Sequence, residues 1–299
     1  MIKNFYSSVS NMNIVTQKKY FVTYNSNRKY NLSNSHLVNL VKHSNFFDKV
    51  YNLTPDDLSK PFSEKYRDIL QLERGGGYWI WKLDILNQLI ESMNDNDLLL
   101  YMDSGSTFNY FGKQRFYDYC EILNTSDYGI LNFSQKFTER EWTVKEIFEY
   151  FEIDLESNIA KTPQIEGTIL LLKKNSHSLF ILNEFNKLLN HDPYLITDKY
   201  NSTQKESYFL ENRHDQSILS ILTKKYGSIN LKNETQFKNR EDEQYDFPFL
   251  ATRHRNQNFL FKSIYNFNLN KASTYPRYFL KNDLRGLDYF FKKYFYFNY

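Results

Sequence analysis

An apolar strand that ends on a carboxylate constrains this chain more than any other feature. Residues 98–102 (Leu-Leu-Leu-Tyr-Met) are apolar without a break, and Asp103 follows them directly. A run of this kind is typical of a strand that is covered on both faces, as in the parallel sheets of α/β proteins. A charge at the end of such a strand is tolerated in the crevice at the carboxyl edge of the sheet, where open α/β sheets bind ligands. We therefore expect Asp103 to mark a binding site.

The residues after this strand indicate the kind of ligand. Ser104 is small, and Gly105 would let the backbone approach a ligand closely. A carboxylate in this position can hold a divalent cation, and the cation in turn can hold a phosphate group. The strand end therefore predicts a nucleotide or nucleotide-sugar site. The alternative is an aspartate that only caps the following turn.

Strand patterns and helix patterns alternate along the chain. The predicted strands lie at residues 20–24, 49–53, 98–102, 128–133, 165–172 and 228–231, and the predicted helices between them include 83–93, 116–123, 179–189 and 217–226. This alternation predicts one Rossmann-like α/β domain, with a mainly parallel central sheet and helices on both faces. We place the domain at residues 19–260, after a polar segment (1–18) and before a C-terminal helical extension (261–299).

Composition and charge exclude several classes of protein. The formal net charge of the 299 residues is only +3, which gives no strong field for nucleic acid. Cys120 is the single cysteine, so an intramolecular disulfide and a cysteine-based zinc site are excluded. No stretch approaches the roughly 18 apolar residues of a membrane span, and the N-terminal residues lack the apolar core of a signal peptide. We expect a cytoplasmic protein.

The C-terminal extension has a pattern of its own. Apolar side chains such as Leu284 and Phe291 share one face of a predicted helix in residues 275–299, with lysine and arginine around them. A basic amphipathic helix rich in aromatic residues can lie on an anionic membrane surface. It can equally pack back onto the domain. Both interpretations stay open.

Three further polar segments could carry chemistry. Residues 212–217 (Asn-Arg-His-Asp-Gln-Ser) precede an apolar helix, where they suit an anion or sugar hydroxyls, or only cap the helix. Residues 74–77 (Arg-Gly-Gly-Gly) match neither a P-loop nor a dinucleotide motif, and they favour phosphate binding or a tight turn. Residues 253–255 (Arg-His-Arg) could close over a diphosphate, or form a solvated basic loop. A Ser-His-Asp hydrolase is excluded, because His214 and Asp215 have no Gly-x-Ser-x-Gly partner segment.

Together these segments resemble the nucleotide-sugar glycosyltransferases of the A-type (GT-A) fold. The resemblance is to a bacterial and viral group related in architecture to glycogenin and the lipopolysaccharide galactosyltransferases. The matching segments are Gly-Tyr-Trp-Ile-Trp-Lys at 77–82, Tyr-Met-Asp-Ser-Gly at 101–105 and His-Asp-Gln-Ser at 214–217. Their order and spacing match across residues 20–255.

The resemblance implies a hexosyltransferase. Such an enzyme moves a sugar from a nucleoside-diphosphate donor, here expected to be UDP-linked, to a hydroxyl group of a glycan or glycolipid acceptor. The expected setting is the synthesis of surface polysaccharide, lipopolysaccharide or a viral glycan, in the cytoplasm or peripherally at the inner face of the membrane.

The resemblance also implies roles for individual residues. Asp103 and His214 would hold Mn²⁺ or Mg²⁺ on the donor diphosphate, although Gly105 stands where the family has a second aspartate. Asp215 is the first candidate for a catalytic base and Glu166 the second. The other donor contacts would come from Thr23, Tyr24, Arg74, Lys82, Ser104, Gly105, Gln164, Gly167, Gln216, Arg253 and His254.

Two other functions stay open at this stage. The missing second aspartate would suit a non-catalytic carbohydrate- or partner-binding protein on a degenerate transferase fold. The same crevice would also serve a nucleotidyl or phosphosugar transferase, which releases pyrophosphate instead of a nucleoside diphosphate.

Overall fold

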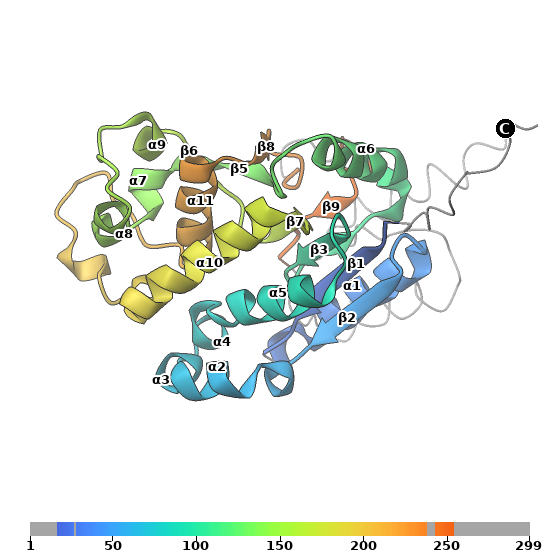
Figure 1. The fold of residues 1–299 in the computed structure, drawn as a ribbon, viewed down its shortest axis with the longest axis horizontal. Helices are drawn as coiled ribbons and strands as arrows, with labels where there is room; N and C mark the ends of the chain where they lie inside the picture. Colours follow the sequence, from blue (N-terminus) through green and yellow to red (C-terminus); the bar gives the residue numbers. More distant parts are fainter. Residues whose placement is uncertain (1–16, 27, 238–242, 254–299) are drawn as a thin grey trace, which may run out of the picture.

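A seven-stranded sheet forms the centre of the computed structural model, which describes residues 17–26, 28–237 and 243–253 (Figure 1). The strand order is β2-β1-β3-β7-β5-β6, and β8 pairs with β5. The strands are β1 (Lys19–Tyr24), β2 (Lys49–Leu53), β3 (Leu98–Met102), β5 (Ile130–Thr138), β6 (Pro163–Ile165), β7 (Ile169–Lys173) and β8 (Ile229–Leu231). β6 and β7 run against the other strands, which share one direction. The expected α/β class is confirmed, and five of the seven strands share one direction, while three of the six pairings in this sheet are antiparallel.

One expected strand is divided in the structure. The apolar segment 165–172 contributes to both β6 and β7, which run in the same direction and both pair with β5, and residues 166–168 form a bend between them. β6 pairs with β5, whereas β7 lies between β3 and β5. Apolar periodicity does not report where a bend interrupts a strand, so the predicted single strand is two strands in the structure.

Long helices cover both faces of the sheet (Figure 1). The helices on one face are α5 (Trp81–Ser92), α10 (Ser176–His191) and α11 (Asp215–Tyr226), and those on the other are α1 (Asn31–Ser44) and α6 (Lys113–Asn124). β3 shows why both faces are needed. Leu99 and Tyr101 belong to the core under α5, and the alternate residues belong to the core with α1 and α6. All five β3 residues are buried, as the apolar run predicts.

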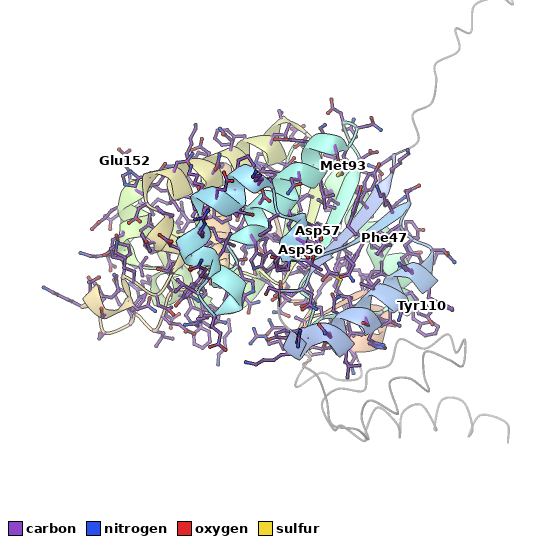
Figure 2. The ribbon with its side chains drawn as sticks, turned by 90° about the horizontal axis from the view of Figure 1, so that it is seen from below. Phe47, Asp56, Asp57, Met93, Tyr110 and Glu152 are labelled. Carbon is purple, nitrogen blue, oxygen red and sulfur yellow. The ribbon has the colours of Figure 1, made fainter. Side chains whose placement is uncertain are left out.

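Short elements extend the ends of this arrangement. The short helices are α2 (Lys60–Lys65), α3 (Arg67–Leu70), α4 (Gly75–Tyr78), α7 (Glu139–Trp142), α8 (Lys145–Tyr150) and α9 (Asn158–Lys161). A second, two-stranded sheet joins β4 (Thr107–Phe108) to β9 (Phe249–Leu250). Glu152, after α8, and Tyr110, after β4, lie toward opposite ends of the molecule (Figure 2).

The domain boundaries stay predictions. The expected N-terminal segment and the amphipathic C-terminal helix fall largely or wholly outside the described residues, as does His254. Within the described ranges, no helix has the length and apolar character that a membrane crossing requires.

Candidate active site

The carboxyl end of β3, the start of β7 and the start of α11 meet at one edge of the sheet. The backbone N–H of Asp103 donates to the carbonyl oxygen of Thr168, 2.9 Å away. Gly167 lies against α11, and a Cβ atom placed on it would lie 2.9 Å from Cβ of Gln216 and 3.3 Å from Oδ2 of Asp215. This close approach explains why the turn before β7 has glycine at its centre. The sequence-predicted residues Asp103, Gly167, Asp215 and Gln216 are therefore neighbours.

A buried lysine joins the three sequence motifs at this edge. Lys82 lies in the first turn of α5, and its side chain is 1% exposed. Its Nζ donates to Oδ2 of Asp215 and, over 2.8 Å, to the carbonyl oxygen of Gly167. It lies 3.7 Å from Oδ1 of Asp103 and 4.6 Å from the centre of the Tyr101 ring. We call Lys82, Tyr101, Asp103, Gly167 and Asp215 the lysine cluster.

Tyr101 fixes one oxygen of Asp103. Residues two apart in a strand point to the same face, and the Tyr101 hydroxyl donates to Oδ1 of Asp103 over 2.5 Å. Burial raises the pKa of Tyr101 well above its usual value, so the hydroxyl keeps its proton. The Asp103 side chain is 31% exposed, and within the described part of the chain its Oδ2 accepts no hydrogen bond. That oxygen is open to a ligand.

Asp215 has a pKa near neutrality. Burial raises the pKa of its carboxyl group to about 6, against the opposing effect of Lys82, and Asp103 raises it further. The carboxyl group therefore gains and loses a proton close to physiological pH. A general base requires this property, since it must be ionised to accept a proton and basic enough to keep it.

The two glutamines lie behind this cluster. Gln164 is fully buried and Gln216 is half-buried. The Nε2 of Gln216 donates to Oε1 of Gln164 over 2.5 Å, and the Oε1 of Gln216 accepts from the N–H of Gly167 over 3.1 Å. Their amides are therefore linked to each other and to the turn that Lys82 holds.

Glu166 lies in the same turn but faces different partners. It is fully buried, and its two oxygens accept from the hydroxyl of Thr235 and, over 3.1 Å, from the amide of Gln236. Burial raises the pKa of Glu166, and Arg253 opposes this effect. The structure thus places the second candidate base against the segment that leads to β9.

The segment after β9 is attached to the turn after β3. Thr252 Oγ1 donates to the carbonyl oxygen of Gly105 over 3.0 Å and lies 3.0 Å from Oγ1 of Thr107. Arg253 follows, exposed and with a left-handed backbone (φ 54°). Gly105 itself is buried and Ser104 is half-buried. This attachment brings the exposed Arg253 close enough for its charge to act on Glu166.

Thr23 and Tyr24 end β1 inside the core. Thr23 is fully buried, and the ring of Tyr24 stacks on Trp81 with centroids 3.9 Å apart. The partly exposed Arg74 pairs with Asp198 over 2.8 Å and with Glu211 over 3.1 Å. Arg74 is therefore held by two carboxylates before any ligand arrives.

His214 contacts the Gly-Tyr-Trp segment. Its ring stacks on Trp79 with centroids 5.4 Å apart, meets the Tyr78 ring edge-on at 4.9 Å, and has Nδ1 2.9 Å from the carbonyl oxygen of Ile196. Burial lowers the pKa of His214 to about 4, so the ring is neutral at physiological pH. Tyr78, Trp79 and His214 all have positive φ, a conformation that costs energy in non-glycine residues and is often found at functional sites.

The donor set for a metal ion is small. Among the described residues, no group of three or more His, Cys, Asp or Glu is gathered that could hold a metal ion. Asp103 offers one open carboxylate oxygen. Mg²⁺ usually keeps several waters and binds through one or two carboxylates together with substrate phosphates. A divalent cation therefore fits here only as a partner of Asp103 and a bound diphosphate.

Several residues of the site had no role assigned to them from the sequence. Tyr101 belongs to the Tyr-Met-Asp-Ser-Gly segment, and its spacing of two from Asp103 could have indicated that the two side chains share a face. Asp198, Glu211, Thr235 and Gln236 lie in irregular segments, where no periodicity indicates which side chains turn inward. Only the fold brings them to Arg74 and Glu166.

Comparisons with known proteins find similarity in structure alone. No family model matches the chain, and no curated protein matches it in sequence. A glycosyltransferase involved in glycosylation of the major capsid of PBCV-1 is 13% identical, with a TM-score of 0.45, and the match covers 85% of this chain and 99% of that one. For the bifunctional glycosyltransferase WbbM the values are 13% and 0.46, over 87% of this chain and 51% of that one.

The galactosyltransferase LgtC, solved with donor and acceptor sugar analogues, is also similar. It is 11% identical with a TM-score of 0.40, over 89% of this chain and 99% of that one. All of these TM-scores lie below 0.5, so the function of this chain has to be inferred from its own site.

Proposed function

We propose that this chain is a glycosyltransferase that moves a sugar from a nucleoside-diphosphate sugar to a hydroxyl group of a glycan or glycolipid acceptor. The lysine cluster is the observation that carries the proposal. Lys82 and Asp215 are 133 positions apart in the sequence, and Asp103 belongs to a third motif, yet one ammonium group contacts both carboxylates. Three motifs that resemble a sugar transferase thus form one site at the ligand-binding edge of the sheet.

Asp215 acts as the base in this proposal. The acceptor oxygen bonds to the anomeric carbon, the bond from that carbon to the diphosphate breaks, and the acceptor proton passes to the carboxylate. Nζ of Lys82 donates to Asp215 and to the carbonyl oxygen of Gly167, so we assign Lys82 to holding these two residues in place. This differs from the direct diphosphate contact that the sequence suggests for Lys82.

The diphosphate gains negative charge as it leaves. Arg253 is exposed and its charge acts on Glu166, so it can approach the leaving diphosphate. Asp103 and the donor phosphates would hold Mn²⁺ or Mg²⁺, which when bound would neutralise part of the same charge. We further propose a UDP-linked hexose as donor and a role in the synthesis of a surface polysaccharide, a lipopolysaccharide or a viral glycan.

Gly105 favours a second candidate, a carbohydrate-binding protein without turnover. Glycine at this position leaves Asp103 as a single open carboxylate, with too few protein ligands to hold a cation unless a diphosphate is also bound.

A donor screen separates the two candidates. Purified protein is incubated with a panel of nucleotide sugars, with and without Mn²⁺, and release of nucleoside diphosphate is measured beside release of pyrophosphate. We expect nucleoside diphosphate from one donor. Glycan binding without any turnover would support the binding protein, and pyrophosphate release would indicate a nucleotidyl transferase.

A further inference from the structure

Tyr101 is a fully buried tyrosine whose hydroxyl has one hydrogen-bond partner among the described residues, the carboxylate of Asp103. The dependence is mutual. Oδ1 of Asp103 accepts from that hydroxyl over 2.5 Å, and no other described group donates a hydrogen bond to the Asp103 side chain. Nζ of Lys82 lies 3.7 Å from the same oxygen, but it donates to Asp215 and to the carbonyl oxygen of Gly167. One neutral donor therefore orients the Asp103 carboxylate.

Tyr119 forms the same kind of bond elsewhere in the molecule. It is also fully buried, and its hydroxyl donates to Oε2 of Glu234 over 2.5 Å. A cation lies over the ring in both places, 4.6 Å from the ring centre of Tyr101 and 4.7 Å from that of Tyr119. The difference is that Arg115 donates to both oxygens of Glu234 over 2.9 Å, so that carboxylate is held without Tyr119. Asp103 has no such second donor among the described residues.

We infer that Tyr101 is a positioning residue, which keeps Oδ2 of Asp103 free to hold a cation on the donor diphosphate. Without the hydroxyl, the carboxylate loses its hydrogen bond and turns to another donor. Lys82 has a third N–H group, and a shift of about 1 Å would bring it within the distance of a charge-assisted hydrogen bond. A salt bridge there would compete with the cation for Asp103. The role toward a cation rests on the proposed function, whereas the orientation of the carboxylate does not.

The variant that tests this inference is Tyr101→Phe, and Tyr119→Phe is its matched control. Each removes one hydroxyl that a fully buried ring donates to a carboxylate, so both should lower stability. Binding of Mn²⁺ in the presence of UDP is measured by electron paramagnetic resonance, with UDP alone as the blank. We expect the Kd for Mn²⁺ to rise about tenfold or more in Tyr101→Phe and to stay within about twofold in Tyr119→Phe. Thermal unfolding establishes that both variants are folded.

Turnover gives a second readout that separates positioning from folding. With the donor found by the screen, Tyr101→Phe should raise the Mn²⁺ concentration for half-maximal turnover about tenfold, while kcat at saturating Mn²⁺ changes less than about threefold. The reason is that a high cation concentration outcompetes Lys82 for Asp103. A tyrosine that served only the fold would instead lower turnover equally at every Mn²⁺ concentration.

The ¹³C NMR resonance of the Asp103 carboxylate, assigned with Asp103→Asn, reports on its surroundings without cation or turnover. It should shift in Tyr101→Phe and stay unchanged in Tyr119→Phe. If the wild type bound no Mn²⁺ but the resonance behaved in this way, the proposed function would lose its cation and the positioning of Asp103 would stand. Wild-type Mn²⁺ affinity in Tyr101→Phe, or an unshifted resonance, would overturn the inference and leave the proposed function intact.

Discussion

Asp215 and Glu166 are both buried carboxylates beside Gly167, but their partners differ. Asp215 contacts the ammonium group of Lys82. Glu166 accepts from the hydroxyl of Thr235 and the amide of Gln236, and Arg253 acts on it from an exposed position. Burial raises the pKa of both groups. The difference lies in the charge of the direct partner.

This comparison shows how one fold assigns two roles to similar side chains. A buried cation keeps the carboxylate of Asp215 available near neutral pH, with a pKa of about 6. Neutral donors instead hold Glu166 to the segment that leads to β9. Pairs of titratable groups in contrasting environments are how acid and base roles are separated in enzymes. We therefore assign the base to Asp215 and a positioning role to Glu166.

Removal of the lysine should have the largest effect on stability. Lys82→Met leaves Asp215 buried without its cation, and loss of one partner of a buried pair typically costs about 3–5 kcal/mol. Urea unfolding at pH 8 measures the loss. The loss of stability should be smaller at pH 5, because the Asp215 carboxyl group is then protonated in the wild type as it is in the variant. The double variant Lys82→Met/Asp215→Asn should regain part of the stability, and no recovery would contradict the pairing.

Gly167→Ala should have a smaller effect. The added methyl group would meet Gln216 at 2.9 Å and Asp215 at 3.3 Å, so α11 has to move by a few tenths of an ångström. Overpacking of this kind costs about 1–3 kcal/mol. The measurement is again urea unfolding. Gly129→Ala, whose methyl group would crowd Asn175 and Ser178 outside the lysine cluster, is a control for strain elsewhere in the fold. An increase in stability would show that the turn is not close-packed against α11.

The pH dependence of turnover and of stability should report the protonation of Asp215. Turnover should fall about tenfold for each pH unit below 6, as Asp215 takes up a proton. Stability should change in the opposite sense. The pKa of Asp215 is raised from 3.8 on folding, so its stabilising contribution is complete below 3.8 and is lost as the pH rises through about 6. Asp103→Asn should lower this pKa, because the charge of Asp103 raises it.

The fold and part of the site could be predicted from the sequence. An unbroken apolar run predicts β3 with both faces covered, so Asp103 had to follow at the sheet edge. The apolar helix after residue 214 likewise placed Asp215 at a helix start. Both predictions rest on local patterns, and the structure contains the strand and the helix that these patterns predict.

The rest depends on contacts that a local pattern does not contain. A lysine at the start of a helix is usually solvated, and nothing near residue 82 indicates that it is buried between carboxylates from β3 and α11. Apolar spacing also missed the turn at Gly167 that divides β6 from β7. The glycine at position 167 is needed because α11 approaches it closely, and Gln216 in that helix comes 49 residues later in the sequence.

The most direct test of the central claim is the rate of nucleoside-diphosphate release by the wild type, Asp215→Asn and Glu166→Gln at pH 7.5. The donor is the one found by the screen. We predict turnover by the wild type, a loss of about 10³-fold or more in Asp215→Asn, and less than about tenfold in Glu166→Gln. Circular dichroism establishes that both variants are folded. Full activity in Asp215→Asn, or a larger loss in Glu166→Gln, would contradict the account.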